Sequence, residues 1–212
     1  DAEAVVSDSI AALKAGNPYT LTIVTPPTTT VDGTVDTILT PNTVINAKDQ
    51  YGNNCQNGVQ IVAALDTGMG TLRGTTTVAI AGGEGNATFT DLGYSKSGET
   101  FKLSFDAVTG DAEAVVSDSI AALKAGNPSR LDIKAKPTIA YTYVNLNPQP
   151  VVHIVDQYGN TVTDNGSAIS IEAYTADNFN GTNSEFNGTS TVYATDNGLA
   201  GGTPTGVANF AG

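Results

Sequence analysis

The residues of this sequence that could do chemistry are mostly carboxylates, and the chemistry that they suit is calcium binding. Ca²⁺ takes about 6–8 hard oxygen ligands, and aspartates placed in turns supply such oxygens. Three aspartates in turns or at expected repeat junctions are the candidate ligands: Asp49, Asp111 and Asp156. The Asp-x-Asp-x-Asp-Gly loop of dedicated calcium sites does not occur. Two interpretations therefore stay open, a calcium site and ordinary solvated turn carboxylates.

Groups for acid–base or nucleophilic catalysis are scarce. The chain has one histidine, His153, one cysteine, Cys55, and no tryptophan. It contains no Gly-x-Ser-x-Gly, His-Glu-x-x-His or Walker motif. We expect no catalytic residues, no enzymatic activity and no cofactor other than calcium. A single cysteine also excludes a disulfide within the chain.

A turn with the sequence Asp-Gln-Tyr-Gly-Asn occurs twice, at residues 49–53 and 156–160. Asp and Asn side chains hydrogen-bond to their own backbone, and Gly supplies a positive φ, so the pattern predicts a structural turn. Its tyrosines are expected to plug the end of a domain while their hydroxyl groups stay in water. The predicted turn residues are Asp49, Tyr51, Gly52, Asn53, Asp156, Tyr158, Gly159 and Asn160.

Short strands must position these turns. Apolar and polar residues alternate with period two, Thr is frequent, and turn signals recur every 8–12 residues or so, which together predict an all-β sandwich. Pro26-Pro27 ends the first run. The expected strands are 19–25, 43–48, 59–65, 75–81, 87–90 and 100–105, followed by 149–155, 168–174 and 189–194.

The chain repeats itself. The sequence DAEAVVSDSIAALKAGNP occupies residues 1–18 and recurs unchanged at 111–128, a spacing of one β-sandwich domain. Weaker matches continue in the same order beyond it. We therefore predict a terminal strand of a preceding repeat at 1–18, a complete repeat at 19–128, and a second repeat at 129–212 that lacks its last strands.

The repeated segment itself is ambiguous. Its apolar residues fit a helical stripe, and Ala and Glu favour helix. An extended strand would place Val6, Ile10 and Ala12 on one face. We favour the extended interpretation, which leads into a linker at 14–18 that ends in Asn-Pro.

Charge and hydropathy limit the classes of partner that we expect the chain to bind. The chain has 212 residues, with 9 Lys and Arg against 21 Asp and Glu, for a formal net charge of −12. Such a surface repels phosphate backbones, so we expect no nucleic-acid binding. No stretch approaches the roughly 18 apolar residues of a membrane span. The start at Asp1 shows no signal-peptide pattern, and we interpret the chain as a mature piece or an excised fragment.

The ordered motifs resemble bacterial immunoglobulin-like repeats of the invasin and intimin kind and those of giant surface adhesins. The matching runs start with Pro-x-x-Leu-x-Ile at 18–23 and 128–133, and continue to the turns that end at Asn53 and Asn160. Further matches lie at 70–78, 85–92 and 97–105. The resemblance implies tandem immunoglobulin-like sandwiches that serve as rigid spacers in adhesins, S-layers and surface fibres.

We therefore expect a structural repeat unit of a secreted, cell-surface protein, whose partners are copies of itself or neighbouring repeats. Residues 1–18 could complete the second repeat of another molecule head-to-tail, which would build filaments. One alternative is a module that binds surface glycan or protein through loops at 175–184 and 196–205, which Tyr174, Phe179 and Phe186 flank or occupy. The other is an accessory domain of a secreted polysaccharide-degrading enzyme.

Overall fold

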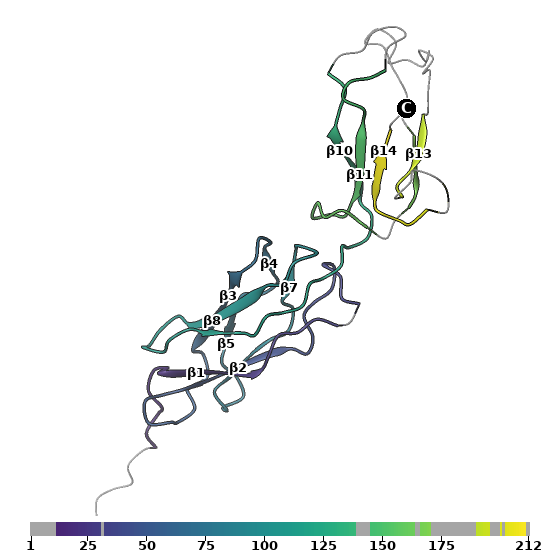
Figure 1. The fold of residues 1–212 in the computed structure, drawn as a ribbon. Coiled ribbons are helices and arrows are strands. Elements are labelled where there is room, and N and C mark those ends of the chain that lie inside the picture. Colours follow the sequence, from purple (N-terminus) through teal and green to yellow (C-terminus); the bar gives the residue numbers. More distant parts are fainter. Residues whose placement is uncertain are drawn as a thin grey trace, which may run out of the picture. The chain divides into compact units, whose positions relative to one another are not determined.

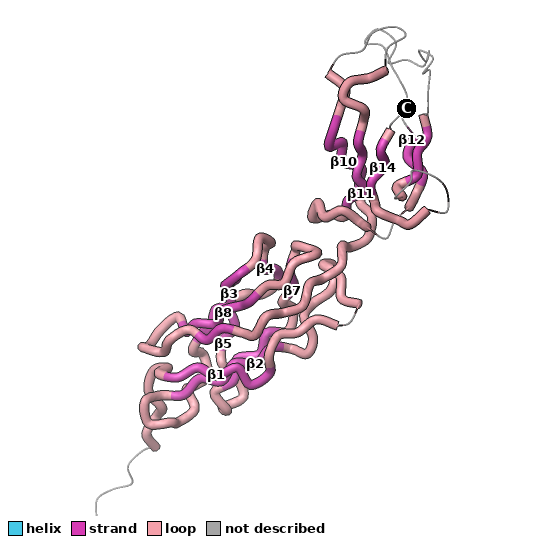
Figure 2. Tube along the Cα trace, viewed as in Figure 1, coloured by secondary structure: helices cyan, strands magenta, loops and turns pink. Residues whose placement is uncertain are grey.

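A computed structural model gives the fold, and every element that it describes is a β-strand (Figures 1 and 2). The described residues are 12–30, 32–138, 145–163, 166–170, 190–195, 200 and 202–210. The prediction of an all-β chain is confirmed. Within these ranges no helix has the length and apolar character needed to cross a membrane.

The internal contacts divide the chain into two units. Unit 1 comprises Asp1–Thr30, Ile38–Tyr94 and Thr100–Ala121, and unit 2 comprises Val31–Thr37, Ser95–Glu99 and Ala122–Gly212. This division follows contacts and not sequence repeats, so the boundaries predicted after residues 18 and 128 stay predictions.

Unit 1 is a sandwich of two antiparallel sheets. One sheet has the strand order β1-β2-β6 and the other has the order β5-β3-β8-β9, while β4 and β7 form a separate pair. This arrangement of seven main strands in two sheets is that of an immunoglobulin-like domain. The strands are β1 (Thr20–Thr25), β2 (Thr43–Lys48), β3 (Gln60–Thr67), β4 (Leu72–Arg73), β5 (Thr77–Ala79), β6 (Asn86–Phe89), β7 (Gly93–Tyr94), β8 (Lys102–Ala107) and β9 (Val115–Val116).

The core of unit 1 lies between the two sheets. Alternate residues of β2 and β8 are buried, as period-two strands with one apolar face require. The rings of Phe89 on β6 and Phe105 on β8 meet across the sandwich at 5.5 Å between centroids. Tyr94 is fully buried, stacks on Phe101 at 3.9 Å, and accepts a hydrogen bond from the Gly70 N–H.

Unit 2 contains a three-stranded sheet, β10-β11-β14, and a two-stranded sheet, β12-β13. Its buried core comes from both sheets and includes Val152, Ile169, Val192 and Phe210. The strands are β10 (Arg130–Ala135), β11 (Val151–Val155), β12 (Ala168–Ser170), β13 (Thr191–Tyr193) and β14 (Val207–Asn209).

The two repeats share their strand register. Leu21 of β1 faces Ala47 of β2, and Leu131 of β10 faces Ile154 of β11. Both strand pairs shift their register at the same position, after Ile23 in β1 and after Ile133 in β10. The weak sequence match therefore reflects one structural unit used twice.

The second copy of the repeated segment is extended, which confirms the strand interpretation there. Val115–Val116 form β9, and Ile120 pairs with Phe101. The face predicted from period two is wrong, however. Ile120 and Leu123 are buried, whereas Val116, the counterpart of Val6, is 46% exposed. Residues 1–11 of the first copy lie outside the described residues.

Candidate functional site

Each unit holds one Asp-Gln-Tyr-Gly-Asn turn, and we call residues 49–53 and 156–160 the anchor turns. In unit 1, Asp49 Oδ1 accepts the backbone N–H groups of Tyr51 and Asn53, both at 2.9 Å. The Asn53 side-chain amide donates to the same carboxylate. Gly52 has a φ of +82°, so the turn closes without strain only with glycine at that position.

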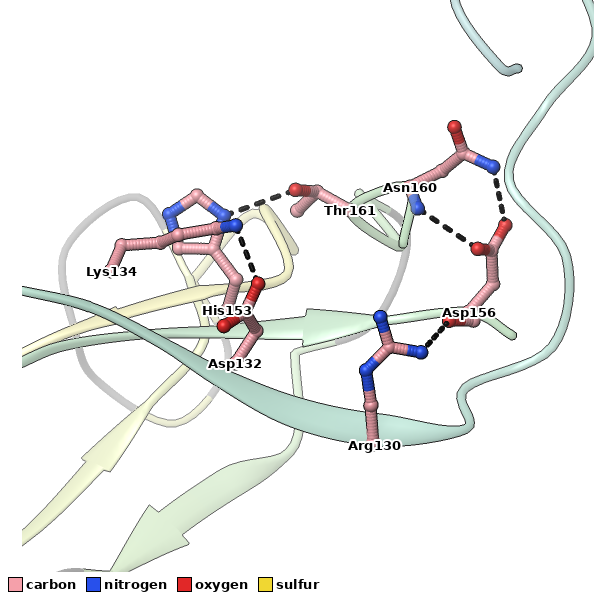
Figure 3. Close-up of polar contacts among 7 residues, drawn as sticks. All are labelled: Arg130, Asp132, Lys134, His153, Asp156, Asn160 and Thr161. Atoms are coloured by element: carbon pink, nitrogen blue, oxygen red, sulfur yellow. Dashed lines mark hydrogen bonds and ion pairs between the residues drawn. The ribbon is translucent and has the colours of Figure 1, made fainter. Parts of the chain in front are cut away.

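The anchor turn of unit 2 repeats this geometry. Asp156 Oδ1 accepts the N–H groups of Tyr158 and Asn160, both at 2.9 Å, and Asn160 Nδ2 donates to Oδ2 at 2.9 Å. Gly159 has a φ of +88°. Figure 3 shows the Asp156–Asn160 pair, with the Arg130 guanidinium donating to the Asp156 carbonyl oxygen at 3.3 Å.

The second carboxylate oxygen of each aspartate holds the chain that enters the repeat. We call residues 15–18 and 125–128, which have the same sequence Ala-Gly-Asn-Pro, the junction segments. The Gly16 N–H donates to Asp49 Oδ2 at 3.0 Å, and the Gly126 N–H donates to Asp156 Oδ2 at 2.9 Å. The anchor turn therefore fixes its own backbone and the incoming junction segment with one carboxylate.

Gly126, in the junction segment of unit 2, lies close against the Asp36 carboxylate. A Cβ at Gly126 would lie 2.3 Å from Asp36 Oδ2, well inside van der Waals contact. Asp36 also accepts the Asn127 N–H at 2.9 Å and the Gln157 side-chain amide at 2.7 Å. Residues 125–128 are thus held between two carboxylates of unit 2.

Asn160 has a further role within unit 2. Its side-chain amide donates to the Ser95 carbonyl oxygen at 2.8 Å, and its Oδ1 accepts the Ser97 N–H at 3.1 Å. With its bond to Asp156, the Asn160 side chain uses both its donor and its acceptor atoms. A buried polar side chain with this many partners stabilises one specific arrangement of its neighbours.

These contacts favour the charged form of both aspartates. The Gly16 N–H, followed by the Asn53 and Tyr51 donors, lowers the pKa of Asp49 to about 2, against an opposing effect of burial. Burial raises the pKa of Asp156, but hydrogen bonds from Asn160, Gly126 and Tyr158 outweigh it and leave the pKa lowered. Both groups are therefore anionic at neutral pH.

The structure places the candidate calcium ligands in different settings. Asp49 and Asp111 line one surface cavity of about 240 Å³ in unit 1, whereas Asp156 belongs to unit 2. The oxygens of Asp49 and Asp156 already accept N–H hydrogen bonds. Among the residues that the structure describes, no group of three or more His, Cys, Asp or Glu is placed to hold a metal. Calcium binding stays a prediction.

Cys55 and His153, the two side chains considered for catalysis, are each packed within their own unit. Cys55 is 1% exposed, and burial raises the pKa of its thiol, an effect to which the nearby Asp49 charge adds. His153 lies on β11, where its Nδ1 is 3.0 Å from Thr161 Oγ1 (Figure 3). Burial lowers the pKa of His153, followed by the effect of the Lys134 charge. The two residues lie in different units.

One predicted role of the turns is wrong. Tyr51 is 80% exposed and Tyr158 is 36% exposed, so the Tyr51 ring does not plug the end of a domain. Most of the loops proposed for ligand binding, at 175–184 and 196–205, lie outside the described residues, as do Tyr174, Phe179 and Phe186.

The contacts that sequence reasoning missed are those of the junction glycines and of Asp36. The signal was available for the glycines, because the unchanged Ala-Gly-Asn-Pro precedes both repeats. No local pattern marks Asp36, which reaches Asn127 and Gln157 across long sequence separations.

Comparison with known proteins gives two distant structural similarities. No protein-family model and no curated protein sequence matches the chain. One similar structure is that of the surface layer protein SbsC, domains 4–9, at 18% identity and a TM-score of 0.31 over 84% of this chain and 26% of that one. The other is FdeC, an Escherichia coli adhesin, at 19% identity and a TM-score of 0.28 over 91% of this chain and 63% of that one. This chain thus spans less than two thirds of either protein.

Proposed function

We propose that this chain is a structural repeat unit of an extracellular surface protein, of the S-layer, surface-fibre or adhesin-stalk type. The observation that carries the proposal is the junction that the chain makes twice. In both repeats one aspartate clamps the incoming Ala-Gly-Asn-Pro segment with its Oδ2 and closes its own turn with Oδ1. A module that binds its own linker in this way suits a tandem array.

Composition supports the same function. The chain has few charged residues, at 14%, and a net charge of −12, which favours solubility at a surface exposed to water. A spacer also needs no ligand-binding pocket. The carboxylates of the two anchor turns hold the turns and the junction segments by hydrogen bonds. We propose secretion to the cell surface and copies of the same repeat as partners, and we propose no enzymatic activity.

Head-to-tail assembly by strand complementation is the finer part of this proposal. Leu13 and Leu123 occupy equivalent positions in the identical segments, yet Leu13 is 95% exposed and Leu123 is 3% exposed. An apolar side chain that is buried in one copy and exposed in the other supports a proposal that the exposed copy packs on another repeat.

The experiment that tests the function is antibody labelling of intact cells that express the parent protein, followed by negative-stain electron microscopy of the purified chain. Surface labelling, together with filaments or arrays of the repeat, is the expected result. Labelling only after the cells are permeabilised would overturn the proposal.

A further inference from the structure

The second anchor turn is hydrogen-bonded to two loops of unit 2, residues 31–37 and 95–99, which we call the docking loops. In the first loop, Asp36 Oδ1 accepts the Gln157 side-chain amide at 2.7 Å. In the second loop, a carbonyl oxygen and an N–H group bond to the Asn160 side chain at 2.8 and 3.1 Å. By sequence, both loops belong to the first predicted repeat, whereas the turn belongs to the second. One repeat therefore supplies the loops that hold the anchor turn of another.

The first anchor turn has the same side chains in different surroundings. Gln50 and Asn53 are the counterparts of Gln157 and Asn160. Asn160 is 5% exposed, whereas Asn53 is exposed, and its described hydrogen bonds go to the aspartate of its own turn. Among the described residues, the Gln50 side chain has no hydrogen-bond partner. The two side chains that hold docking loops in the second turn thus lie open in the first.

The two junction segments differ in the same way. Gly126 is buried against Asp36, whereas Gly16 is exposed, and a Cβ there would meet only its own anchor aspartate, at 3.5 Å. The Asn127 N–H donates to Asp36 at 2.9 Å. The Asn17 N–H makes no hydrogen bond within the described part of the chain. The first junction segment therefore offers a backbone donor that the second uses to bind a docking loop.

The open donors of the first repeat meet at one cavity. Asn17 and Gln50 both line the surface cavity of about 240 Å³ in unit 1. Their counterparts, Asn127 and Gln157, are the two donors that share the Asp36 carboxylate in unit 2. The cavity thus presents the same pair of donors to one point, which suits a single carboxylate acceptor.

We propose that the first anchor turn and its junction segment bind the docking loops of a second copy of this repeat. Asp36 of that copy would accept the Asn17 N–H and the Gln50 side-chain amide, and its second docking loop would bond to Asn53. The inference rests on the proposed function and deepens it, because it names the partner and the contacts that join one repeat to another.

The identity of the two sites supports this partner over an unrelated ligand. Both junction segments read Ala-Gly-Asn-Pro, and both turns read Asp-Gln-Tyr-Gly-Asn. The strands that join each junction segment to its turn also pair in the same register. Donors of the same type in the same frame favour the same acceptors, and the acceptors that the second site binds are the docking loops.

Negative charge at the cavity does not prevent this docking. In unit 2, Asp36 and Asp156 already lie on either side of the junction segment, and each accepts N–H groups from it. N–H donors between two carboxylates offset their repulsion. Asp111 also lines the cavity of unit 1, so the hydrogen bonds to an incoming Asp36 must outweigh one further like charge.

The test is amide hydrogen exchange, measured by NMR, in a chain lengthened by a copy of residues 19–110 placed directly before the N-terminal residue. Because residues 1–18 repeat residues 111–128 unchanged, this copy is joined to the first anchor turn as the first repeat is joined to the second. We expect exchange of the Asn17 N–H to slow about tenfold or more, because it gains an acceptor. The Asn127 N–H, already bonded to a docking loop, is the internal reference and should exchange equally slowly in both chains.

Two substitutions show whether the protection comes from the proposed contacts. Asp36→Ala in the added copy alone should remove the protection of Asn17 and leave Asn127 slow, and Asp36→Ala in the original copy alone should do the reverse. Gln50→Ala leaves the hydrogen bonds within the turn in place. It should speed exchange of Asn17 about fivefold in the lengthened chain and leave it unchanged in the original chain.

Exchange of Asn17 that is as fast in the lengthened chain as in the original chain would overturn the inference. Protection that survives Asp36→Ala in the added copy would overturn it as well. If Asn17 stays unprotected while intact cells are labelled at the surface, only the docking inference is lost. If Asn17 is protected while labelling requires permeabilised cells, docking stands and the proposed function is lost.

Discussion

At the scale of single residues, two aspartates decide how each repeat begins. Asp156 is fully buried and accepts hydrogen bonds from Gly126, Tyr158 and Asn160. Its removal would leave several buried N–H donors without acceptors, and each such group costs about 1–3 kcal/mol. The anchor aspartates are therefore worth more to stability than their position in turns suggests.

We expect Asp156→Ala to lower the free energy of unfolding of unit 2 by about 3 kcal/mol. The measurement is urea denaturation followed by circular dichroism, with exchange in β11 as a readout specific to unit 2. Asp32→Ala is the matched control, because Asp32 is exposed and pairs with exposed Lys124 at 2.8 Å. Its loss should change the free energy of unfolding far less than Asp156→Ala does, because an ion pair exposed to water is screened by the solvent. Equal effects of the two substitutions would contradict the role of the anchor turn.

The same carboxylates predict a loss of stability in acid. The pKa of Asp49 is lowered in the folded state to about 2, so its contribution is complete above the ordinary Asp pKa, near 4. That contribution is lost as the pH falls through the folded value. We expect the urea midpoint to fall between about pH 4 and pH 2, and to fall less steeply in Asp49→Asn. Parallel profiles for the two proteins would show that Asp49 is not responsible.

Two glycines with positive φ allow the cost of backbone strain to be measured apart from the cost of a steric clash. Gly74 has a φ of +91°, and a Cβ there would lie 2.1 Å from the Asp91 carbonyl oxygen. Gly82 has a φ of +80° with nothing within 4 Å. We expect Gly82→Ala to cost about 1–2 kcal/mol, and Gly74→Ala to cost about 2 kcal/mol more. Thermal unfolding measures both, and equal losses would contradict the steric argument.

At the scale of elements, the same leucine position has different surroundings in the two repeats. We expect Leu21→Ala to lower the free energy of unfolding of unit 1 by about 3 kcal/mol, since Leu21 is buried. Leu131→Ala should cost unit 2 less than about 1 kcal/mol, because Leu131 is 55% exposed. Exchange measured separately in β2 and β11 follows the two units. A large cost for Leu131→Ala would contradict the exposure of Leu131 on β10.

Most strands could be predicted because their pattern is local. Thr43–Lys48 follows from alternation, and the predicted and observed bounds agree there. The pair β4 and β7 was missed, since two residues are too few to show a period. The face of the repeated segment was wrong because its buried residues, Ile120 and Leu123, are three apart. Only neighbours distant in sequence decide which of its side chains are covered.

The anchor turns of the candidate site could be predicted from the sequence, whereas the distant residues that they contact could not. The residues of Asp-Gln-Tyr-Gly-Asn specify a turn by local chemistry, and the Asp–backbone bonds follow from it. The bond from Gly126 to Asp156 joins residues 30 positions apart, and no local pattern encodes it. The exposure of Tyr51 likewise depends on what surrounds the turn, which sequence alone did not reveal.

At the scale of the whole molecule, the net charge of −12 would act against the proposed association between copies of the chain. Like-charged molecules repel one another at low ionic strength. At 0.1 M salt, exposed charges that are more than about 10 Å apart are largely screened from one another. Association of the chain should therefore strengthen as NaCl is added, and sedimentation velocity measures this directly. Association that weakens with salt would mean that attraction between opposite charges dominates.

Stabilisation by a specific calcium site can be distinguished from the general effect of ionic strength. The carboxylates of Asp49 and Asp156 are already occupied by N–H donors, which leaves Asp111 as the candidate ligand with the fewest described contacts. We therefore expect CaCl₂ to raise the melting temperature no more than NaCl at equal ionic strength. A specific site would instead stabilise the chain in proportion to the logarithm of the calcium concentration above its dissociation constant. If CaCl₂ gives such a rise and Asp111→Asn abolishes it, the cavity that Asp49 and Asp111 line binds calcium, and the repeat is stiffened by a metal as well as by its hydrogen bonds.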